Sequence, residues 1–263
     1  MIGAAQSVGA GNAHANALHK TFNAHAKHGV KSVDHSAWTA ILNSHLVRGE
    51  DGLNRFKYAK LKKGGLGALQ NYLAGLQATD PESLTANEQF AFWVNLYNAK
   101  TVEIVTRHYP VASIRDIRLS LNPFSGPWKK KVVRVSGVDL SLDDIEHAIL
   151  RPVWKDPRIH YAVNCASVGC PNLLATAYSG TKLETMLDAA ARAYVNSPRG
   201  VRIENGTVTV SSLYDWYAED FGASVPEILE HIALHAEPVL AKRLRNAARI
   251  DGYVYDWMLN GAK

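Results

Sequence analysis

Residues 85–110 read TANEQFAFWVNLYNAKTVEIVTRHYP, and this stretch decides the fold class. Thr85 and Glu88 have the spacing of a capping box, in which each side chain bonds the backbone N–H of the other residue. Apolar and aromatic residues then recur at helical spacing until about His108. Pro110 ends the pattern because the residue before a proline is restricted to extended backbone. The stretch therefore predicts one long helix.

One side of this helix carries polar residues among apolar ones. At 100° per residue, Glu88, Asn95 and Asn98 fall in line with Ala91 and Val102. Such a stripe is buried or faces a cleft, and buried amides and carboxylates need hydrogen-bond partners. Two interpretations stay open. The stripe is a structural network that fixes neighbouring loops, or it is the wall of a ligand cleft, with Glu88, Asn95 and Asn98 as binding residues.

Helical patterns also dominate the rest of the chain, and the strand signals are short. Further helices are predicted over residues 34–46, 61–76, 141–150, 181–195, 225–235 and 238–246. Hairpins are predicted through Ser136-Gly137 and through Asn205-Gly206, the latter with type I′ turn chemistry. Residues 1–15 are predicted to form a disordered tail. With no internal repeat or break in composition, residues 16–263 are predicted to form a single α+β domain, mostly helical around a small, largely antiparallel sheet.

Composition narrows the class of partner. The chain has 263 residues and a net charge of 29 − 24 = +5, and its only tight basic run, 129–131, lies against an apolar strand pattern. Proteins that bind nucleic acid concentrate Lys and Arg on one face. We interpret the run as solvated, with an anionic ligand near Trp128 as the alternative, and expect no nucleic-acid partner. No stretch approaches the ~20 apolar residues that span a bilayer, so no transmembrane segment is expected.

A second group of candidate residues lies in the segment 158–172, which reads RIHYAVNCASVGCPN. Its apolar part, 159–163, is predicted to be a short buried strand. The alternation of a strand puts His160 and Asn164 on the same face. Asn164 is therefore a candidate binding residue and His160 a candidate base.

The same segment holds both cysteines of the chain, Cys165 and Cys170. Pro171 suits the first position of a helix, so Cys170 is predicted to cap a helical turn, where the helix dipole favours the thiolate. Three readings stay open for the pair. The cysteines form a disulfide across a short loop, they are two inert small side chains, or one is a nucleophile with His160 as its base.

In the third reading, Asn164, Glu88 or Asn95 would orient the base. A metal site would need a histidine and a carboxylate from elsewhere to complete its ligands. We therefore predict neither a metal nor another cofactor.

Five separated blocks resemble the domain of unknown function 547 family. They occur in order at residues 88–99, 140–147, 160–171, 214–222 and 255–260. The resemblance covers roughly residues 34–260 and converges on Glu88, Asn95, Asn98, His160, Cys165 and Cys170. Bacterial members of the family are often exported, which implies a periplasmic or secreted protein. The sequence begins without a visible secretion signal, which leaves a cytoplasmic location as the alternative.

Two hypotheses about function follow. In the first, the protein is a cysteine-dependent hydrolase or transferase acting on a small thiol, amide or peptide-like ligand. Cys170 or Cys165 is then the reactive sulfur, and His160 is the base. In the second, the protein is a non-catalytic binding module with a structural Cys165–Cys170 disulfide. Its cleft, between the polar stripe and the cysteine loop, holds a peptide or small molecule. The sequence predicts no oligomeric state.

Overall fold

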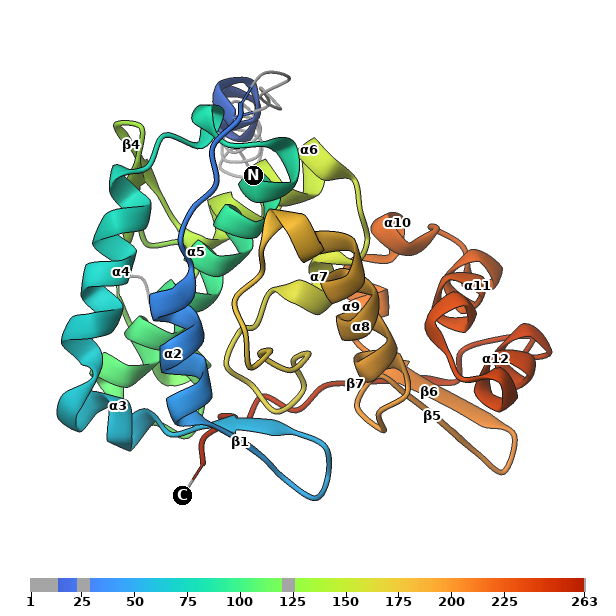
Figure 1. The fold of residues 1–263 in the computed structure, drawn as a ribbon. Helices are drawn as coiled ribbons and strands as arrows, with labels where there is room; N and C mark the ends of the chain where they lie inside the picture. Colours follow the sequence, from blue (N-terminus) through green and yellow to red (C-terminus); the bar gives the residue numbers. More distant parts are fainter. Residues whose placement is uncertain (1–13, 23–28, 120–125, 263) are drawn as a thin grey trace, which may run out of the picture.

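The computed structural model describes residues 14–22, 29–119 and 126–262 (Figure 1). Helix α5 (Ala86–His108) is the longest described helix and is buried along most of its length. Half of the predicted capping box forms, because the Thr85 hydroxyl accepts the N–H of Glu88 at 3.4 Å. The N–H of Thr85 donates to the carbonyl of Lys31 instead of to Glu88. The helix ends before Pro110, as the sequence predicts.

Shorter helices pack around α5 and, with three small sheets, form the rest of the described structure. Helices α3, α4 and α8 contact α5 directly, and α2 packs against α4. Beyond α8 lie α11 and α12, at the right of Figure 1, around a second hydrophobic cluster. The described helices are α2 (Ser36–His45), α3 (Tyr58–Gly64), α4 (Leu66–Ala78), α6 (Arg151–Trp154), α7 (Ile159–Ala162), α8 (Leu183–Val195), α9 (Leu213–Trp216), α10 (Ala218–Phe221), α11 (Val225–His235) and α12 (Pro238–Arg245).

The described strands form three small sheets. Strands β1 (Leu46–Arg48) and β2 (Asn54–Phe56) pair antiparallel, as do β3 (Val133–Val135) and β4 (Val138–Leu140). In the third sheet, β6 (Thr207–Ser211) lies between β5 (Val201–Glu204), which is antiparallel to it, and β7 (Gly252–Val254), which is parallel.

Both predicted hairpins are confirmed. Asn205 and Gly206 have φ values of 48° and 83°, as a type I′ turn requires. The predicted fold class, mostly helical α+β with small, largely antiparallel pairing, is also confirmed, with the strands divided among three sheets. Of the predicted tail, residues 1–13 lie outside the described residues, and residues 14 and 15 are helical. The single domain over residues 16–263 stays a prediction.

The predicted strand over residues 159–163 is wrong. Residues Ile159–Ala162 form the short helix α7, and only Val163 is extended. The turn is started by Asp156, whose carboxylate accepts the N–H of Arg158 at 2.8 Å. His160 and Asn164 therefore do not share a strand face.

The predicted helical turn after Cys170 is also wrong, because Pro171 and the residues after it form no helix. Side chains bind their backbone instead. Asn164 donates to the carbonyl of Pro171 at 2.6 Å, and Arg199 donates to the carbonyl of Cys170. Cys170 therefore has no helix dipole to stabilise its thiolate.

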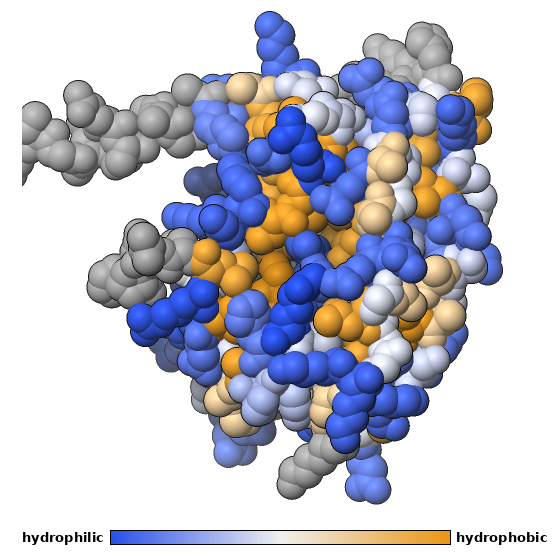
Figure 2. All heavy atoms as spheres, turned by 90° about the vertical axis from the view of Figure 1, so that its left-hand side faces the viewer, coloured by the Kyte–Doolittle hydropathy of each residue, from blue (hydrophilic) through white to orange (hydrophobic). Residues whose placement is uncertain are grey.

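Hydrophilic side chains cover most of the face that Figure 2 shows, and hydrophobic side chains gather near its middle. Within the described ranges, no helix combines the length and apolar character needed to cross a bilayer.

Candidate functional site

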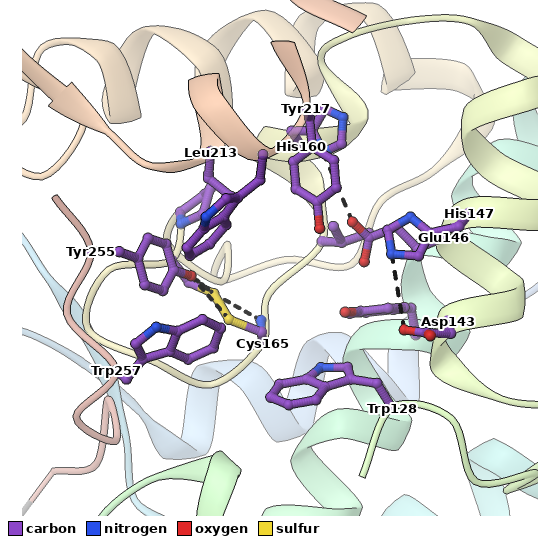
Figure 3. A pocket seen from close by; sticks show the side chains of 15 residues that line it. Trp128, Asp143, Glu146, His147, His160, Cys165, Leu213, Tyr217, Tyr255 and Trp257 are labelled. Carbon is purple, nitrogen blue, oxygen red and sulfur yellow. Dashed lines mark hydrogen bonds and ion pairs between the residues drawn. A yellow bond between two sulfur atoms is a disulfide. The ribbon is translucent and has the colours of Figure 1, made fainter. Parts of the chain in front are cut away.

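The candidate site is a cavity of about 200 Å³ (Figure 3). It is assembled from segments far apart in sequence: α5, the π-helix η3 (Asp144–Leu150), α7, the cysteine loop 163–171, α9 and the segment after β7. Its lining residues are Tyr97, Trp128, Asp143, Glu146, His147, His160, Val163, Cys165, Cys170, Pro171, Leu213, Trp216, Tyr217, Tyr255 and Trp257.

His160 is held in place from two sides. Its Nε2 lies 2.6 Å from Oδ2 of Asp220, and its ring stacks on Tyr217 with centroids 4.2 Å apart. Burial alone would raise the pKa of Asp220, but the bonds from His160 and Arg151 hold that pKa well below its usual range. An ionised carboxylate only accepts, so Nε2 of His160 carries a proton. The other ring nitrogen, Nδ1, lies 3.9 Å from Glu146 and has no hydrogen-bond partner among the described residues.

Glu146 is the buried carboxylate that His160 faces. Its charge acts on the phenols of Tyr97 and Tyr217, which line the same cavity. Burial, followed by the charge of Glu146, raises the pKa of both phenols well above the usual value. Both hydroxyls therefore keep their protons.

Asp143 brings a second carboxylate to the same side. Burial raises the pKa of Asp143, and the neighbouring charges of Glu146 and Asp144 act in the same direction. His147, 3.9 Å away, and Lys129 oppose the rise without cancelling it. Of the described residues that line the cavity, none is a lysine or an arginine. This side of the cavity therefore concentrates negative charge.

Aromatic rings form the opposite wall. Tyr255 lies between two tryptophans, with centroids 4.9 Å from Trp216 and 4.7 Å from Trp257. Trp128 meets Trp257 edge-on at 5.9 Å, and Arg115 lies over the ring of Trp257 at 5.2 Å. Trp216 is 45% exposed, which is high for so large an apolar side chain. A cluster of part-exposed rings around a cavity is typical of a binding surface.

The cysteines form the floor between these walls. Cys165 and Cys170 are joined by a disulfide, with their Cα atoms 6.3 Å apart. The hydroxyl of Tyr255 lies 3.1 Å from each sulfur. The backbone of the loop is paired with the segment after β7, because the N–H of Gly169 donates to the carbonyl of Asp256 at 2.8 Å. Of the three readings that the sequence left open, the structure contains the disulfide.

Of the residues singled out in the sequence, His160, Cys165 and Cys170 line the cavity. The four candidate binding residues Glu88, Asn95, Asn98 and Asn164 do not line it, and all four are buried and bonded to backbone. Asn95 exchanges two hydrogen bonds with the backbone of Tyr178, at 2.8 and 3.0 Å. Asn95 therefore fixes the backbone at Tyr178, and of the stripe only Asn98 bonds the start of the cysteine loop, at Asn164.

Glu88 belongs to a separate buried network. Its carboxylate accepts the N–H of Gly180 at 2.7 Å and lies 3.1 Å from Nε2 of His35. Burial would raise the pKa of Glu88, but these bonds hold it below its usual value. Nδ1 of His35 lies 2.6 Å from the hydroxyl of Tyr72.

Sequence reasoning gave no role to most of the cavity. The missed lining residues include Asp143, Glu146, Trp216, Tyr217, Tyr255 and Trp257, and Asp220 beside His160 was also missed. Trp128 entered only through the alternative of an anionic ligand. The missed residues that lie in the blocks 214–222 and 255–260 share one signal, the alternation of aromatic and acidic residues, whereas Asp143 and Glu146 lie outside these blocks. Within the described part of the chain, no three His, Cys, Asp or Glu side chains converge in a way that could hold a metal ion.

Comparison with known proteins identifies one family. Residues 81–195 match the model of the family described as protein of unknown function, DUF547. No curated protein and no solved structure matches the chain. The matched segment contains the polar stripe, both carboxylates, His160 and both cysteines.

Proposed function

We propose that this chain, whose residues 81–195 match the DUF547 family model, is a binding module that holds a small organic cation in the cavity described above. One observation carries the proposal: Asp143 and Glu146 meet in a cavity walled by aromatic rings and, among the described lining residues, without a lysine or arginine. Ligands of this class are primary amines and quaternary ammonium compounds.

The aromatic wall supports a cationic ligand through its ring faces. A cation within about 6 Å of a tryptophan centroid is attracted by the ring quadrupole, and this attraction grows when the site excludes water. Trp128, Trp216 and Trp257 all border the cavity. Arg115 already makes such a contact with Trp257, 5.2 Å from the ring centroid.

The carboxylates support the same class of ligand through charge. Burying a carboxylate is unfavourable unless a partner compensates its charge. Burial raises the pKa of Asp143, and the nearby charges of His147 and Lys129 do not cancel that rise. An ammonium group beside Asp143 and Glu146 would supply the missing partner, so the cavity favours a cation over a neutral molecule of the same shape.

The disulfide favours a binding module over the alternative, a cysteine-dependent hydrolase or transferase. A nucleophilic cysteine acts as a thiolate, and both sulfurs of the pair are bonded to each other. The enzyme hypothesis therefore requires that Cys165 and Cys170 are first reduced. Periplasmic or secreted location stays a proposal from the family resemblance, and an intact disulfide fits such an oxidising compartment.

The test is a matched pair of ligands. Choline is titrated into the protein beside its neutral isostere, in which carbon replaces nitrogen, and binding is followed by calorimetry and tryptophan fluorescence. We expect saturable binding of choline and binding of the isostere weaker by about tenfold or more, since a desolvated cation–π contact contributes about 2 kcal/mol. Equal binding of the two ligands, or no saturable binding of either, would contradict the proposal.

Two variants locate the binding. Asp143→Asn removes one charge from the cavity, and Asp139→Asn makes the same change on the exposed strand β4. We expect the first to weaken choline binding and the second to leave it unchanged. Trp216→Ala removes a half-exposed ring of the wall and should also weaken binding. Equal affinities of the two asparagine variants would place the cation elsewhere.

A further inference from the structure

We propose a second activity for the cavity, which does not depend on the organic cation: its disulfide undergoes exchange with small aliphatic thiols, with Cys165 as the attacked sulfur and Cys170 as the leaving thiolate. The argument rests on how differently the protein surrounds the two sulfurs.

The first difference is access. Cys165 is partly exposed, whereas Cys170 is 3% exposed. Both border the cavity, which gives a small molecule a route to the disulfide. Exchange begins when a thiolate attacks one sulfur of the bond, and access to that sulfur helps to decide which one is attacked. The sulfur of the less buried residue, Cys165, is therefore the target.

The second difference is the number of hydrogen-bond donors. The sulfur of Cys170 accepts the backbone N–H of Cys165 at 2.9 Å and also has the hydroxyls of Tyr255 and Ser167 at 3.1 and 3.5 Å. Hydrogen bonds to the charged form of a group favour that form. The sulfur of Cys165 has the same two hydroxyls nearby, but no backbone N–H among its described contacts. Cys170 is thus the better-stabilised thiolate, and the thiol of lower pKa leaves faster.

The donors on Cys170 are themselves fixed. Ser167 Oγ lies 3.0 Å from the Tyr255 hydroxyl and can donate to it, which leaves the tyrosine proton for sulfur. In that arrangement the donors to Cys170 are the N–H of Cys165 and the Tyr255 hydroxyl. Arg199 donates to the carbonyls of Val168 and Cys170, and Asn164 donates to the carbonyl of Pro171. After the disulfide breaks, these bonds hold Cys170 where it can close the bond again.

The reaction balances with two thiols. The first thiolate, RS⁻, bonds to the Cys165 sulfur, the Cys165–Cys170 bond breaks, and its electron pair stays on Cys170 as the thiolate. A second RS⁻ attacks the R-bearing sulfur of the mixed disulfide and releases RSSR and the Cys165 thiolate. The protein disulfide gains two electrons, and two thiols are oxidised to one disulfide. Reversal of these steps oxidises the protein with RSSR.

The first experiment maps the mixed disulfide. Native protein is mixed with 2-mercaptoethanol, quenched with acid at short times, alkylated and sequenced by mass spectrometry. We expect the thiol adduct on Cys165 and the alkyl group on Cys170. An adduct mainly on Cys170 would overturn the assignment. Reduction that occurs only after the protein is unfolded would overturn the activity itself and leave a structural disulfide.

The second experiment measures the leaving group. In the Cys165→Ser variant, the ultraviolet absorbance of the Cys170 thiolate is followed against pH. We expect a pKa below the ~8.5 of an ordinary cysteine. Adding Tyr255→Phe should raise it by about one unit, because a hydrogen bond to a charged group is lost. Tyr253→Phe, on the exposed edge of β7 and without a described contact to sulfur, is the matched control and should leave it unchanged. A Cys170 that titrates at or above the ordinary value, or equal effects of the two tyrosine changes, would overturn the proposal.

Discussion

The side chain of Asn98, on helix α5, hydrogen-bonds the backbone on both sides of Val163, where the cysteine loop begins. Its Oδ1 accepts the N–H of Asn164 at 2.8 Å, and its Nδ2 donates to the carbonyl of Ala162 at 2.9 Å. Asn164 in turn accepts the N–H of Ala166 at 2.8 Å. One helical side chain thus supplies the bonds that a neighbouring strand would make, and a second asparagine shapes the loop beyond it.

Asn98→Ala should lower the free energy of unfolding by about 1–3 kcal/mol, because two buried backbone groups lose their partner. Urea denaturation measures the change. Asn87→Ala, on the exposed side of the same helix, is the matched control and should stay within about 0.5 kcal/mol of the parent. If the two variants were equally stable, the two hydrogen bonds of the Asn98 side chain would contribute nothing to the free energy of unfolding.

Glu88→Gln should change how stability responds to acid. The pKa of Glu88 is lower in the folded protein than the usual 4.5, because bonds from His35 and Gly180 outweigh burial. Its contribution to stability is therefore present above pH 4.5 and is lost as pH falls through the lower folded value. Urea midpoints measured on acidification should fall less steeply in Glu88→Gln than in the parent. The same change at exposed Glu82 should leave the slope as it was, and matching slopes for all three proteins would rule out this role of Glu88.

The buried His231 should make the stability of the protein depend on pH in a second, separate range. Burial, followed by the charge of His235, lowers the pKa of His231 from 6.5 to about 4. Its neutral ring lies 2.9 Å from the Tyr161 hydroxyl. Between pH 6.5 and about 4, His231 binds a proton in the unfolded chain but stays neutral in the folded protein. The contribution of His231 to stability is therefore present above pH 6.5 and is lost as pH falls toward about 4. His231→Gln, which does not titrate, should flatten the urea midpoint across this window, and an unchanged profile would contradict the assignment.

Local chemistry made much of the fold predictable. The Thr85 cap and Pro110 bound α5, and Asn205-Gly206 fixes a hairpin, because these signals act within a few residues. The segment Ile159–Ala162 was mispredicted as a strand because a short buried apolar run has no period that separates strand from helix. The backbone at the end of this segment is hydrogen-bonded by the side chain of Asn98, and no local sequence pattern predicts that contact.

The cavity was less predictable for a different reason. His160, Cys165 and Cys170 were found because they lie close together in one segment. Asp143 and Trp216 lie outside that segment in the sequence, and they meet it only through the packing of the folded chain. Tyr97 lies within the predicted long helix and is buried, and it also lines the cavity, where the charge of Glu146 adds to burial in raising the pKa of its phenol.

Because the cysteine loop pairs with the segment after β7, the two cysteines are synthesised before the residues of that segment that contact them. Cys165 and Cys170 are synthesised long before Tyr255, which supplies the hydroxyl at both sulfurs, and before Asp256, which binds Gly169. Until residues 255–257 have been synthesised, the contacts from Tyr255 and Asp256 to the cysteine loop cannot form, and the aromatic wall is incomplete. The cavity can therefore shield the two cysteines only after the segment that follows β7 has been made and has docked on the loop.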